Sequence, residues 1–435
     1  MSPESRHAGA RESPDAAGPL PRVLVLSESL PWRPLKGGDL RTWQNINALA
    51  GAACVGVFGL CSNDTRRNAP PQLPLAFWTT STDPALTSPP PKGLRLAARA
   101  WLLDPAGHPS DLFYSPGAAA ELTRLLASFR PDMVLVEGLW LHGYLGVIRA
   151  AGCRTVLDCH NVEAAVFHEL ARSNHRQDFE GRVIRDVIPA RTEAIERAAV
   201  GTADQLWVCS EEDARRLREM YLPPAPIVVI PNGIRLDDYA ARPLEAGSER
   251  AGVLTLVFPG IYSYLPNALA ATFLVNEILP RLAAACEAPC RLQLVGPMPT
   301  PEMCAASARD PRIVVTGPLP DIRPLFAAAT AMPVPLFHGG GTRLKVLEAF
   351  AAGLPVVSTA KGVEGLGAEH GSHLLVAETP EAFVDAVLAL WRDDALARRL
   401  AANARALAAE RFSWTVIGPR IRGAVGRLHE SRTDA

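Results

Sequence analysis

Short apolar segments alternate with helical patterns along almost the whole chain, and this alternation constrains the fold more than any other feature. In the first half, the apolar segments include RVLVLS (22–27), DMVLVE (132–137) and QLWVC (205–209). Strands this short and this apolar are typical of parallel sheets that are buried on both faces, where helices make right-handed crossovers between the strands. The pattern therefore predicts a doubly wound α/β fold.

A second series of the same kind follows a polar segment and includes LTLVF (254–258) and LPVVS (354–358). Because 435 residues are too many for one ordinary hydrophobic core, the two series indicate two domains. Ligands of such folds bind beyond the carboxyl ends of the strands, so we expect the site in a cleft between the two domains. In chain order we predict a disordered tail (1–20), an amino-terminal Rossmann-like domain (21–240), a linker (241–252), a carboxyl-terminal Rossmann-like domain (253–415) and a final helix (416–435) that can pack back on the amino-terminal domain.

The composition excludes several classes of protein. The 44 Lys and Arg residues are balanced by 45 Asp and Glu residues, so no overall positive field attracts nucleic acid. No apolar stretch reaches the roughly 18 residues of a membrane span, and the first residues lack the apolar core of a signal peptide. The eight cysteines lack the usual zinc-ligand spacing and suit reduced residues of a core. These observations predict a cytoplasmic protein.

The segment HGGGTRLKVLEAFAAGLPVVST (338–359) is the most informative motif of the chain. It opens a predicted helix that ends at Gly353, which is followed by Leu-Pro. Consecutive glycines let backbone N–H groups approach an anion, the helix start adds its positive end, and Arg343 and Lys345 add two charges. Such a loop suits a diphosphate, although a flexible turn followed by a solvated basic pair gives the same pattern. It is neither a P-loop nor a G-x-G-x-x-G motif.

Two further segments carry signals of a site. Gly37 and Gly38 directly precede a predicted helix, and this glycine pair is either a turn or a second loop that closes on the same ligand. His160 follows the strand segment TVLD (155–158). At the carboxyl edge of a sheet this histidine can face the ligand, and a structural role is the alternative. The helix after the glycine pair has an apolar face that we expect to be buried, formed by Leu40, Trp43, Ile46 and Leu49.

Taken together, these stretches resemble the retaining glycosyltransferases of family 4, which have the GT-B fold of two facing Rossmann-like domains. The resemblance is to bacterial enzymes that build exopolysaccharides and related surface glycans. It extends from Arg22 to about Trp414, with the motifs in the expected order. The matching stretches are GGDLRTWQNINAL, LDCHNVE, VCSEEDARRL, VIPNGI, GIYSYLPNALAATFLVNEILPRL, LQLVG, VVTGPLPDIRPLF and GGGTRLKVLEAFAAGLPVVST.

The resemblance implies roles for individual residues. Glu348 matches the glutamate that binds the nucleotide ribose. Arg343 and Lys345 lie in the loop that holds the diphosphate, and His160 matches the histidine of the acceptor-side domain that touches the donor sugar. The other donor-binding residues that it implies are Gly37 and Gly38 near the phosphates, the stretch from Gly317 to Leu319 whose backbone reads the base, and Gly340, Gly341 and Thr342 of the diphosphate loop.

Two positions depart from the family pattern. Gly340 stands where the family has its first glutamate, which usually contacts the donor sugar, so the identity of the sugar stays open. The Arg and Lys that usually follow the first strand of the second domain are absent, and PGIYSYLPN with Gly260 and Asn267 takes their place. We expect Arg343 and Lys345 to supply that charge instead, because both loops would face one diphosphate.

The implied reaction transfers a hexose-type sugar from a nucleoside diphosphate donor to a hydroxyl of a glycan or lipid-linked acceptor, with retention at the anomeric carbon. No D-x-D run is evident, so we expect no metal and no cofactor, with the loop cations stabilising the leaving diphosphate. No nucleophilic carboxylate is evident either, which favours front-face attack assisted by the leaving phosphate. The alternatives are an epimerase of the same fold that acts on UDP-sugars, a sugar-nucleotide-binding pseudoenzyme and a phosphorylase-like enzyme.

A predicted helical segment from Phe167 to Arg197 is rich in arginine. The arginines are Arg172, Arg176, Arg182, Arg185, Arg191 and Arg197. They form either a solvated helix face or a patch that attracts an anionic membrane carrying a lipid-linked acceptor. In the second case the protein would lie peripherally at the inner face of the membrane.

Overall fold

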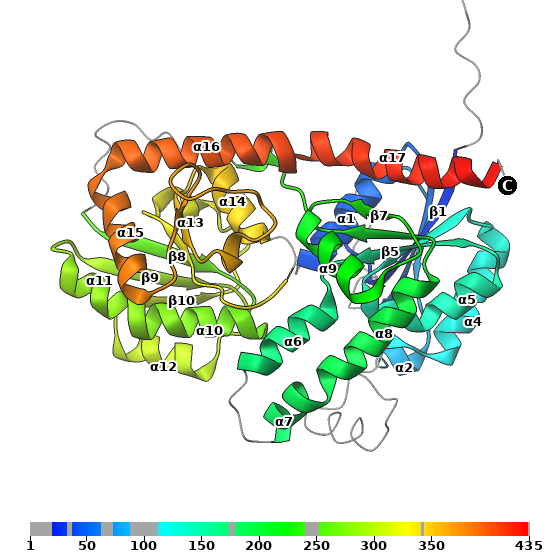
Figure 1. The fold of residues 1–435 in the computed structure, drawn as a ribbon, viewed down its shortest axis with the longest axis horizontal. Coiled ribbons are helices and arrows are strands. Elements are labelled where there is room, and N and C mark those ends of the chain that lie inside the picture. The colour runs from blue at the N-terminus through cyan, green and yellow to red at the C-terminus, as the bar shows by residue number, and fades with distance from the viewer. Residues whose placement is uncertain are drawn as a thin grey trace, which may run out of the picture.

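The computed structural model of the chain describes residues 20–32, 37–61, 73–87, 111, 113–173, 179–239, 252–340 and 343–433. Figure 1 shows two α/β domains side by side, as the alternating pattern predicts. Residues 1–19 of the predicted tail and residues 241–251 of the predicted linker lie outside the described residues.

The amino-terminal domain is built on a seven-stranded parallel sheet in the order β3-β2-β1-β4-β5-β6-β7. Successive residues of β1 enter different cores, since Leu24 and Leu26 pack on one face of the sheet and Val23 and Val25 on the other. The strand order reverses between β1 and β4, and this switch point leaves a crevice at their carboxyl ends. The strands are β1 (Arg22–Ser29), β2 (Cys54–Cys61), β3 (Leu75–Thr80), β4 (Met133–Glu137), β5 (Arg154–Cys159), β6 (Gln205–Val208) and β7 (Ile227–Val229).

Two helices of this domain begin after a serine whose side chain satisfies a free backbone N–H group. Ser115 accepts a hydrogen bond from the amide of Ala118 at the start of α4, and Ser210 accepts one from the amide of Asp213 at the start of α9. The helical segments are α1 (Gly37–Leu49), α2 (Pro84–Thr87), α4 (Pro116–Phe129), η3 (Leu139–Tyr144), α5 (Leu145–Ala150), α6 (Glu163–Ser173), α7 (Phe179–Asp186), α8 (Ile188–Thr202), α9 (Glu211–Tyr221) and η4 (Leu236–Asp238).

The buried face of α1 agrees with the predicted one at Ile46 and Leu49 but not in the first half of the helix. Leu40 and Trp43 are only half-buried, whereas the polar residues Arg41, Thr42 and Asn45 are fully enclosed. The reason is the position of α1, because its first half lies over the polar carboxyl edge of the sheet, where charged partners replace an apolar surface.

The arginine-rich segment is helical as predicted, and it contains the three helices α6, α7 and α8. Pro189 lies in the first turn of α8, where a missing N–H group is tolerated but a preceding helix cannot continue. Arg185 pairs with Asp186 at 2.8 Å, and Arg197 pairs with Glu193 at 2.9 Å. Arg176 lies outside the described residues.

The carboxyl-terminal domain contains two three-stranded parallel sheets, β10-β9-β8 and β11-β12-β13. A bridge between Leu256 of β8 and Ala331 before β11 joins them side by side. The chain order therefore reverses between β8 and β11, which makes the second switch point. The strands are β8 (Leu254–Pro259), β9 (Cys290–Val295), β10 (Ile313–Gly317), β11 (Met332–Val334), β12 (Val356–Ser358) and β13 (Leu375–Val376).

The helices of the carboxyl-terminal domain cover this sheet pair. α14 ends at Gly353, whose φ of 69° is left-handed, and the chain then enters β12 as predicted. The helical segments are α10 (Leu265–Phe273), η5 (Leu274–Ile278), α11 (Leu279–Ala285), α12 (Pro301–Arg309), α13 (Arg323–Ala328), α14 (Leu344–Ala352), η6 (Lys361–Val363), α15 (Pro380–Arg392), α16 (Asp394–Phe412) and α17 (Trp414–Thr433).

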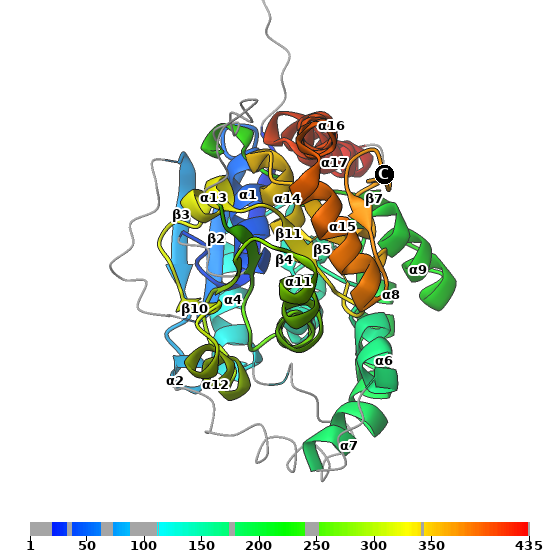
Figure 2. The same ribbon diagram turned by 90° about the vertical axis from the view of Figure 1, so that its left-hand side faces the viewer.

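The last two helices run along one edge of both domains, as Figures 1 and 2 show. α16 packs in the core of the carboxyl-terminal domain, and α17 packs on the amino-terminal domain through Ile417 and Ile421. They meet at Ser413, where the amide of Ile234 donates to the carbonyl oxygen of Phe412 at 2.8 Å. This junction is a point at which the chain passes between the domains.

The continuous helical segment Leu265–Ala285 has the length and apolar composition of a membrane span, which the sequence did not lead us to expect. One of its faces packs in the core of the carboxyl-terminal domain through Leu274, Ile278 and Leu282. Because the core of a folded domain already holds this face, the length and composition of one such helix are weak evidence of a membrane span.

Candidate active site

The two switch points face each other and bring together loops that are far apart in the sequence. A Cβ atom at Gly37 in the first turn of α1 would lie 3.1 Å from Leu344 Cδ1 at the start of α14. A Cβ atom at Gly340 would lie 2.7 Å from Val166 Cγ2 and 3.2 Å from Asn161 Oδ1. Gly340 therefore leaves room for the other domain, and a larger side chain there would push the domains apart.

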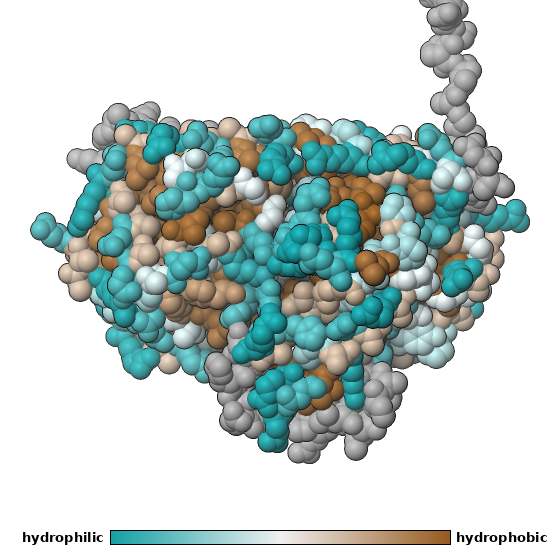
Figure 3. Space-filling view, in the orientation of Figure 1, coloured by the Kyte–Doolittle hydropathy of each residue, from teal (hydrophilic) through white to brown (hydrophobic). Residues whose placement is uncertain are grey.

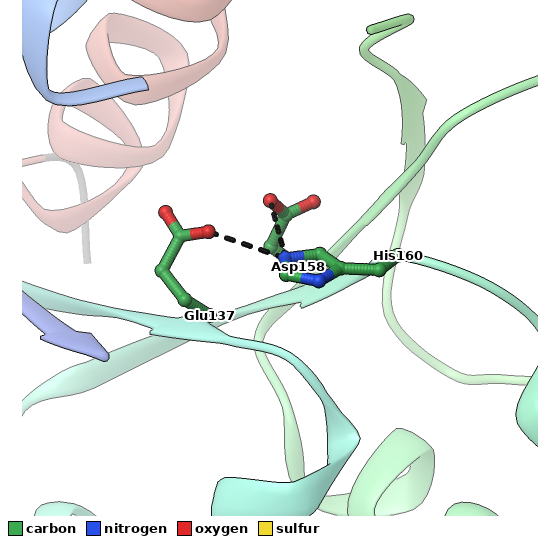
Figure 4. A group of neighbouring side chains, drawn as sticks. All are labelled: Glu137, Asp158 and His160. Carbon is green, nitrogen blue, oxygen red and sulfur yellow. Dashed lines mark hydrogen bonds and ion pairs between the residues drawn. The ribbon is translucent and has the colours of Figure 1, made fainter. Parts of the chain in front are cut away.

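His160 lies after β5 in front of a buried charge network, which Figure 4 shows with its two carboxylates. Its Nε2 is 3.4 Å from Glu137 Oε2 and 3.7 Å from Asp158 Oδ2. Arg41 of α1 holds Asp158 with two hydrogen bonds, of 2.7 Å from Nε and 2.5 Å from Nη2. Asn45 Nδ2 donates to both carboxylates, at 3.1 Å to Glu137 and 2.9 Å to Asp158. The two acids are thereby held behind the imidazole.

The network sets the charge of its members. Burial raises the pKa of Glu137, and the neighbouring Asp158 raises it further. Burial alone would raise the pKa of Asp158, but the Arg41 guanidinium outweighs it and lowers that pKa. Burial alone would lower the pKa of His160, but the contacts with Glu137 and Asp158 outweigh it and raise that pKa. His160 therefore carries its proton to higher pH than an ordinary histidine.

The imidazole borders the glycine pair at the start of α1. A Cβ atom at Gly38 would lie 3.2 Å from His160 Nδ1, so only glycine leaves the ring in place. On the other side, Gly138 has a φ of 100° and its Cβ would lie 3.8 Å from the same ring. His160 remains partly open, with 24% of its side chain exposed, so a ligand can reach it.

A metal ion does not fit this cluster, although potential ligand atoms of Glu137, Asp158 and His160 lie within 4.8 Å of one another. Both oxygens of Asp158 already accept hydrogen bonds from the Arg41 guanidinium, and both oxygens of Glu137 accept from Asn45 or Thr42. A divalent cation would have to displace these donors and would be repelled by the buried guanidinium. Arg41 fills the electrostatic role that a cation would have.

Lys345, Asn267 and Gly260 meet at the carboxyl end of β8. Lys345 Nζ donates to Asn267 Oδ1 at 2.7 Å and lies 4.0 Å from the centre of the Phe258 ring. A Cβ atom at Gly260 would lie 2.9 Å from Asn267 Nδ2 and 3.3 Å from Lys345 Nζ. Burial, and then repulsion from Arg343, lower the pKa of Lys345 to about 7. Among the described residues no acid is in contact with this ammonium, which is therefore ready for an incoming anion.

Arg343 has a different arrangement from the one that its sequence position suggests. Its Nη1 donates to the carbonyl oxygen of Gly340, and its Nη2 donates to the carbonyl oxygen of Gly339 at 2.8 Å. The side chain is buried, its Nε has no hydrogen-bond partner among the described residues, and burial lowers its pKa. The guanidinium thus folds back on its own loop and holds the turn before α14, rather than pointing freely at a ligand.

Glu348 lies one turn further along α14 than Lys345. It accepts a hydrogen bond of 3.0 Å from the hydroxyl of Tyr239, which comes from the segment after η4. Burial raises the pKa of Glu348, and the Tyr239 hydroxyl and Lys345 oppose this rise. One carboxylate oxygen, Oε2, remains without a hydrogen bond in the part of the chain that the structure describes and is available to a ligand hydroxyl.

The remaining predicted residues lie at the end of β10 or beyond the described chain. Gly317 has a φ of 67° and open space where a Cβ atom would be, and Leu319 after it is 39% exposed. Gly341 and Thr342 lie outside the described residues. Gly296, which the prediction did not include, has a φ of 138°, and a Cβ atom there would collide with the carbonyl oxygen of Gly260. A glycine directly after a buried strand was the signal for it.

Ion pairs hold the two domains together beside these loops. Lys361 Nζ lies 2.7 Å from Glu169 Oε1 of α6 and 2.9 Å from Glu364 Oε2. Arg216 of α9 reaches Glu364 Oε1 at 2.6 Å. All four side chains are largely covered, with 17–27% of each exposed. The described arrangement is therefore a closed one in which both domains contribute to the site.

Comparison with known families accounts for most of the chain. Residues 15–233 match the family model described as a glycosyl transferase 4-like domain. Residues 254–393 match the model described as glycosyl transferases group 1. The gap between the two matches contains the predicted linker. No curated protein sequence matched the chain.

Solved structures share the whole fold at low sequence identity. Sucrose-phosphate synthase from Thermosynechococcus elongatus is 18% identical, with a TM-score of 0.72 over 95% of this chain and 100% of that one. Anabaena HepE in complex with UDP-glucose is 15% identical, with a TM-score of 0.61 over 93% and 99% of the two chains. The lipopolysaccharide outer core galactosyltransferase WaaB is 13% identical, with a TM-score of 0.56 over 93% and 99%. At this identity the likeness shows the fold, which is the predicted GT-B arrangement.

Proposed function

The chain belongs to the glycosyltransferases with a glycosyl transferase 4-like domain and a group 1 domain, and on this premise we propose that it is a retaining, metal-independent hexosyltransferase. The donor in this proposal is a nucleoside diphosphate sugar. The observation that carries it is the close approach of Leu344, at the start of the helix that bears Lys345 and Glu348, to Gly37 of the opposite domain. The neighbouring Gly38 borders His160.

The proposed diphosphate site lies between the start of α14 and the glycine pair of α1. Lys345 supplies the positive charge, and the amides at the start of α14 supply N–H groups and the positive end of the helix. Arg343 contributes by holding the loop carbonyls of Gly339 and Gly340 away from the anion. Glu348 Oε2 then accepts a hydrogen bond from a ribose hydroxyl, with Tyr239 fixing the carboxylate.

The donor sugar in this proposal lies against His160. The protonated imidazole donates a hydrogen bond to a sugar hydroxyl, and the buried pair of Glu137 and Asp158 keeps the ring oriented. Both carboxylates lie behind the ring and are held by Arg41, Asn45 and Thr42, so neither is free to attack the anomeric carbon. This arrangement supports front-face attack over a covalent intermediate.

The bond changes in this mechanism balance without a further reactant. The acceptor hydroxyl oxygen forms a bond to the anomeric carbon while the bond from that carbon to the diphosphate oxygen breaks. Negative charge develops on the leaving diphosphate oxygen as its bond to carbon breaks, and the diphosphate then takes the proton of the acceptor hydroxyl. Lys345 and the start of α14 stabilise that charge in a closed site, where such stabilisation is the largest usual contribution to catalysis.

A UDP-sugar is the first donor to test, because the similar HepE structure is a complex with UDP-glucose. The acceptor in the proposal is a bacterial surface glycan or a lipid-linked saccharide, which the similarity to WaaB supports at the level of fold. A peripheral contact of a cytoplasmic enzyme with an anionic membrane is part of this proposal. The pairing of Arg185 and Arg197 with acids leaves less positive charge on α7 and α8 for such a contact.

The experiment that tests the function incubates the full chain with UDP-, GDP-, ADP- and dTDP-sugars labelled in the sugar. We expect one nucleotide class to stabilise the fold by about 2.7 kcal/mol at 100 times its dissociation constant. We also expect slow release of that nucleoside diphosphate, with transfer to added glycan acceptors and retention shown by NMR. Conversion of the sugar to its epimer would instead identify an epimerase. Tight binding with no turnover toward any acceptor would support a pseudoenzyme.

A further inference from the structure

A second concave region lies at the hinge and contains none of the residues of the proposed active site. This hinge groove has a volume of about 650 Å³ and runs along β7 between α9 and α17. It reaches the α16–α17 junction at Phe412 and the loop of the carboxyl-terminal domain that holds Gly365 and Gly367. In Figure 3 the surface here is apolar and is bordered by hydrophilic residues of α17 and α9.

Four arginines border the hinge groove: Arg218 of α9, Arg411 of α16, and Arg420 and Arg427 of α17. None of them has a carboxylate partner among the described residues, in contrast to Arg215 and Arg216 of α9, which both pair with Glu212. Two acids also line the groove: Glu212, which Arg215 and Arg216 neutralise, and Glu211. Four arginines against the one remaining acid leave the groove with an excess of positive charge. Arginine is the side chain best suited to hold phosphate oxygens in a bidentate contact.

The floor of the hinge groove is apolar. Ile227 and Val229 of β7 are half-buried, and Phe412 closes the end near the hinge. A ligand that fits both features has a phosphate group for the arginines and an organic part for the floor. The volume lies within the usual range of sites for small molecules.

Two larger occupants fit less well. β7 is the edge strand of the sheet, but it has three residues and lies between Pro226 and Pro231, so it is too short to template an added peptide strand. A second copy of the chain would bring the same arginines against each other. The concave shape and the charge both favour a small anion.

Both domains line the hinge groove, so a ligand that fills it touches both. A Cβ atom at Gly365 would lie 2.8 Å from Ser210 Cβ, which shows how closely the two domains approach at this place. Gly367 has a φ of 64°, and the Arg411 guanidinium lies against it. We infer that the hinge groove binds a small phosphate-bearing organic anion, and that its occupancy favours the closed arrangement of the domains.

The test is calorimetric titration of the full chain with phenyl phosphate and with inorganic phosphate at low ionic strength. We expect phenyl phosphate to bind more tightly, because its ring covers the apolar floor. The double variant Arg420→Gln with Arg427→Gln should weaken phenyl phosphate binding about tenfold or more, since each lost contact is a charge-assisted hydrogen bond. The same titrations on Lys345→Ala separate this binding from the proposed diphosphate site, and we expect the groove to retain its affinity in that variant.

A matched control removes the same charge elsewhere. Arg149→Gln with Arg291→Gln changes two exposed arginines that do not border the groove, and we expect less than about a twofold change in affinity. Hydrogen exchange should show phenyl phosphate protecting both residues 226–231 and residues 363–368. The inference would be overturned if phenyl phosphate bound the groove variant as tightly as the wild type, or if its affinity fell equally in the control. It would also be overturned by protection of only one of the two domains, or by no binding at millimolar concentrations.

Discussion

The affinity for a nucleoside diphosphate should fall with rising pH because of Lys345. Burial lowers the pKa of this lysine to about 7 in the structure, from an ordinary value of about 10.4. An anion in contact with the ammonium favours the charged form and raises that pKa again. Above pH 7 most of the free protein has lost the Lys345 proton that binding requires. The apparent affinity is therefore the full affinity multiplied by the fraction of the protein in which Lys345 is still protonated.

The size of the effect follows from the titration. With a pKa of about 7, roughly half of Lys345 is protonated at pH 7.0 and about 3% at pH 8.5, so the affinity should fall about 16-fold over this interval. The interval begins at pH 7.0 because a terminal phosphate, with a pKa of about 6, is already deprotonated there. Below pH 7 the charged fraction of Lys345 rises from about half to nearly all, so the lysine adds at most about a further twofold gain in affinity.

Calorimetric titration with UDP at pH 7.0, 7.75 and 8.5 measures this fall in affinity directly. Titrations at pH 8.5 in buffers of different ionisation enthalpy should also show that binding takes up nearly one proton. Lys345→Met should bind weakly and without this pH dependence. Lys345→Arg should bind with little pH dependence, because a guanidinium stays charged throughout. A wild-type affinity that is constant from pH 7.0 to 8.5, or a decline that persists in Lys345→Met, would refute the reasoning.

Four further outcomes follow from the site. His160→Ala should lower turnover far more than UDP affinity, because the imidazole faces the proposed sugar position; separate measurement of kcat and of the dissociation constant checks this. Arg343→Ala should destabilise the transition state by on the order of 2–4 kcal/mol. This loss should not add to that of Lys345→Ala, because both changes act on one loop, and kcat/KM of the single and double variants tests the non-additivity. Glu348→Ala should weaken the binding of UDP and of the donor alike. Tyr239→Phe should weaken both about fivefold, because it removes one hydrogen bond to Glu348. A change confined to kcat would contradict the ribose contact. Turnover should be unchanged by EDTA, and activity that disappears and returns with Mg²⁺ or Mn²⁺ would remove the metal-independent mechanism.

The residues of the diphosphate loop show how far sequence reasoning reaches. Three glycines with Arg343 and Lys345 before a helix indicated an anion site, and the structure brings Lys345 beside Asn267 and Gly260 from the other loop. The sequence did not indicate that Arg343 would turn back on the carbonyls of Gly339 and Gly340. Two cations two positions apart look equivalent in a sequence, and only the path of the backbone decides which one turns back on its own loop.

The polar face of α1 shows where sequence reasoning stops. The helix itself was predictable from its glycine start and its periodicity, but Arg41 binds an aspartate 117 positions away, and Asn45 binds a glutamate 92 positions away. The periodicity of apolar residues predicts which apolar side chains are buried, because burial removes their apolar surface from water. It gives no information on polar side chains that are buried against an opposite charge from a distant part of the sequence. Gly340 is similar, because its need for a small residue comes from Val166 of the other domain.

By itself, the sequence determined the alternation of strands and helices, the division into two domains and the glycine-rich ends of the strands. These features follow from local physics: the hydrophobic period of each segment, the capping of each helix and the conformational freedom of glycine. The tertiary structure alone decided that Glu137 and Asp158 orient and charge His160, that Tyr239 fixes Glu348, and that four arginines border one groove at the hinge. Each of these depends on contacts between segments that are distant in sequence, and such contacts are set by how the strands are ordered in the sheets and how the two domains close.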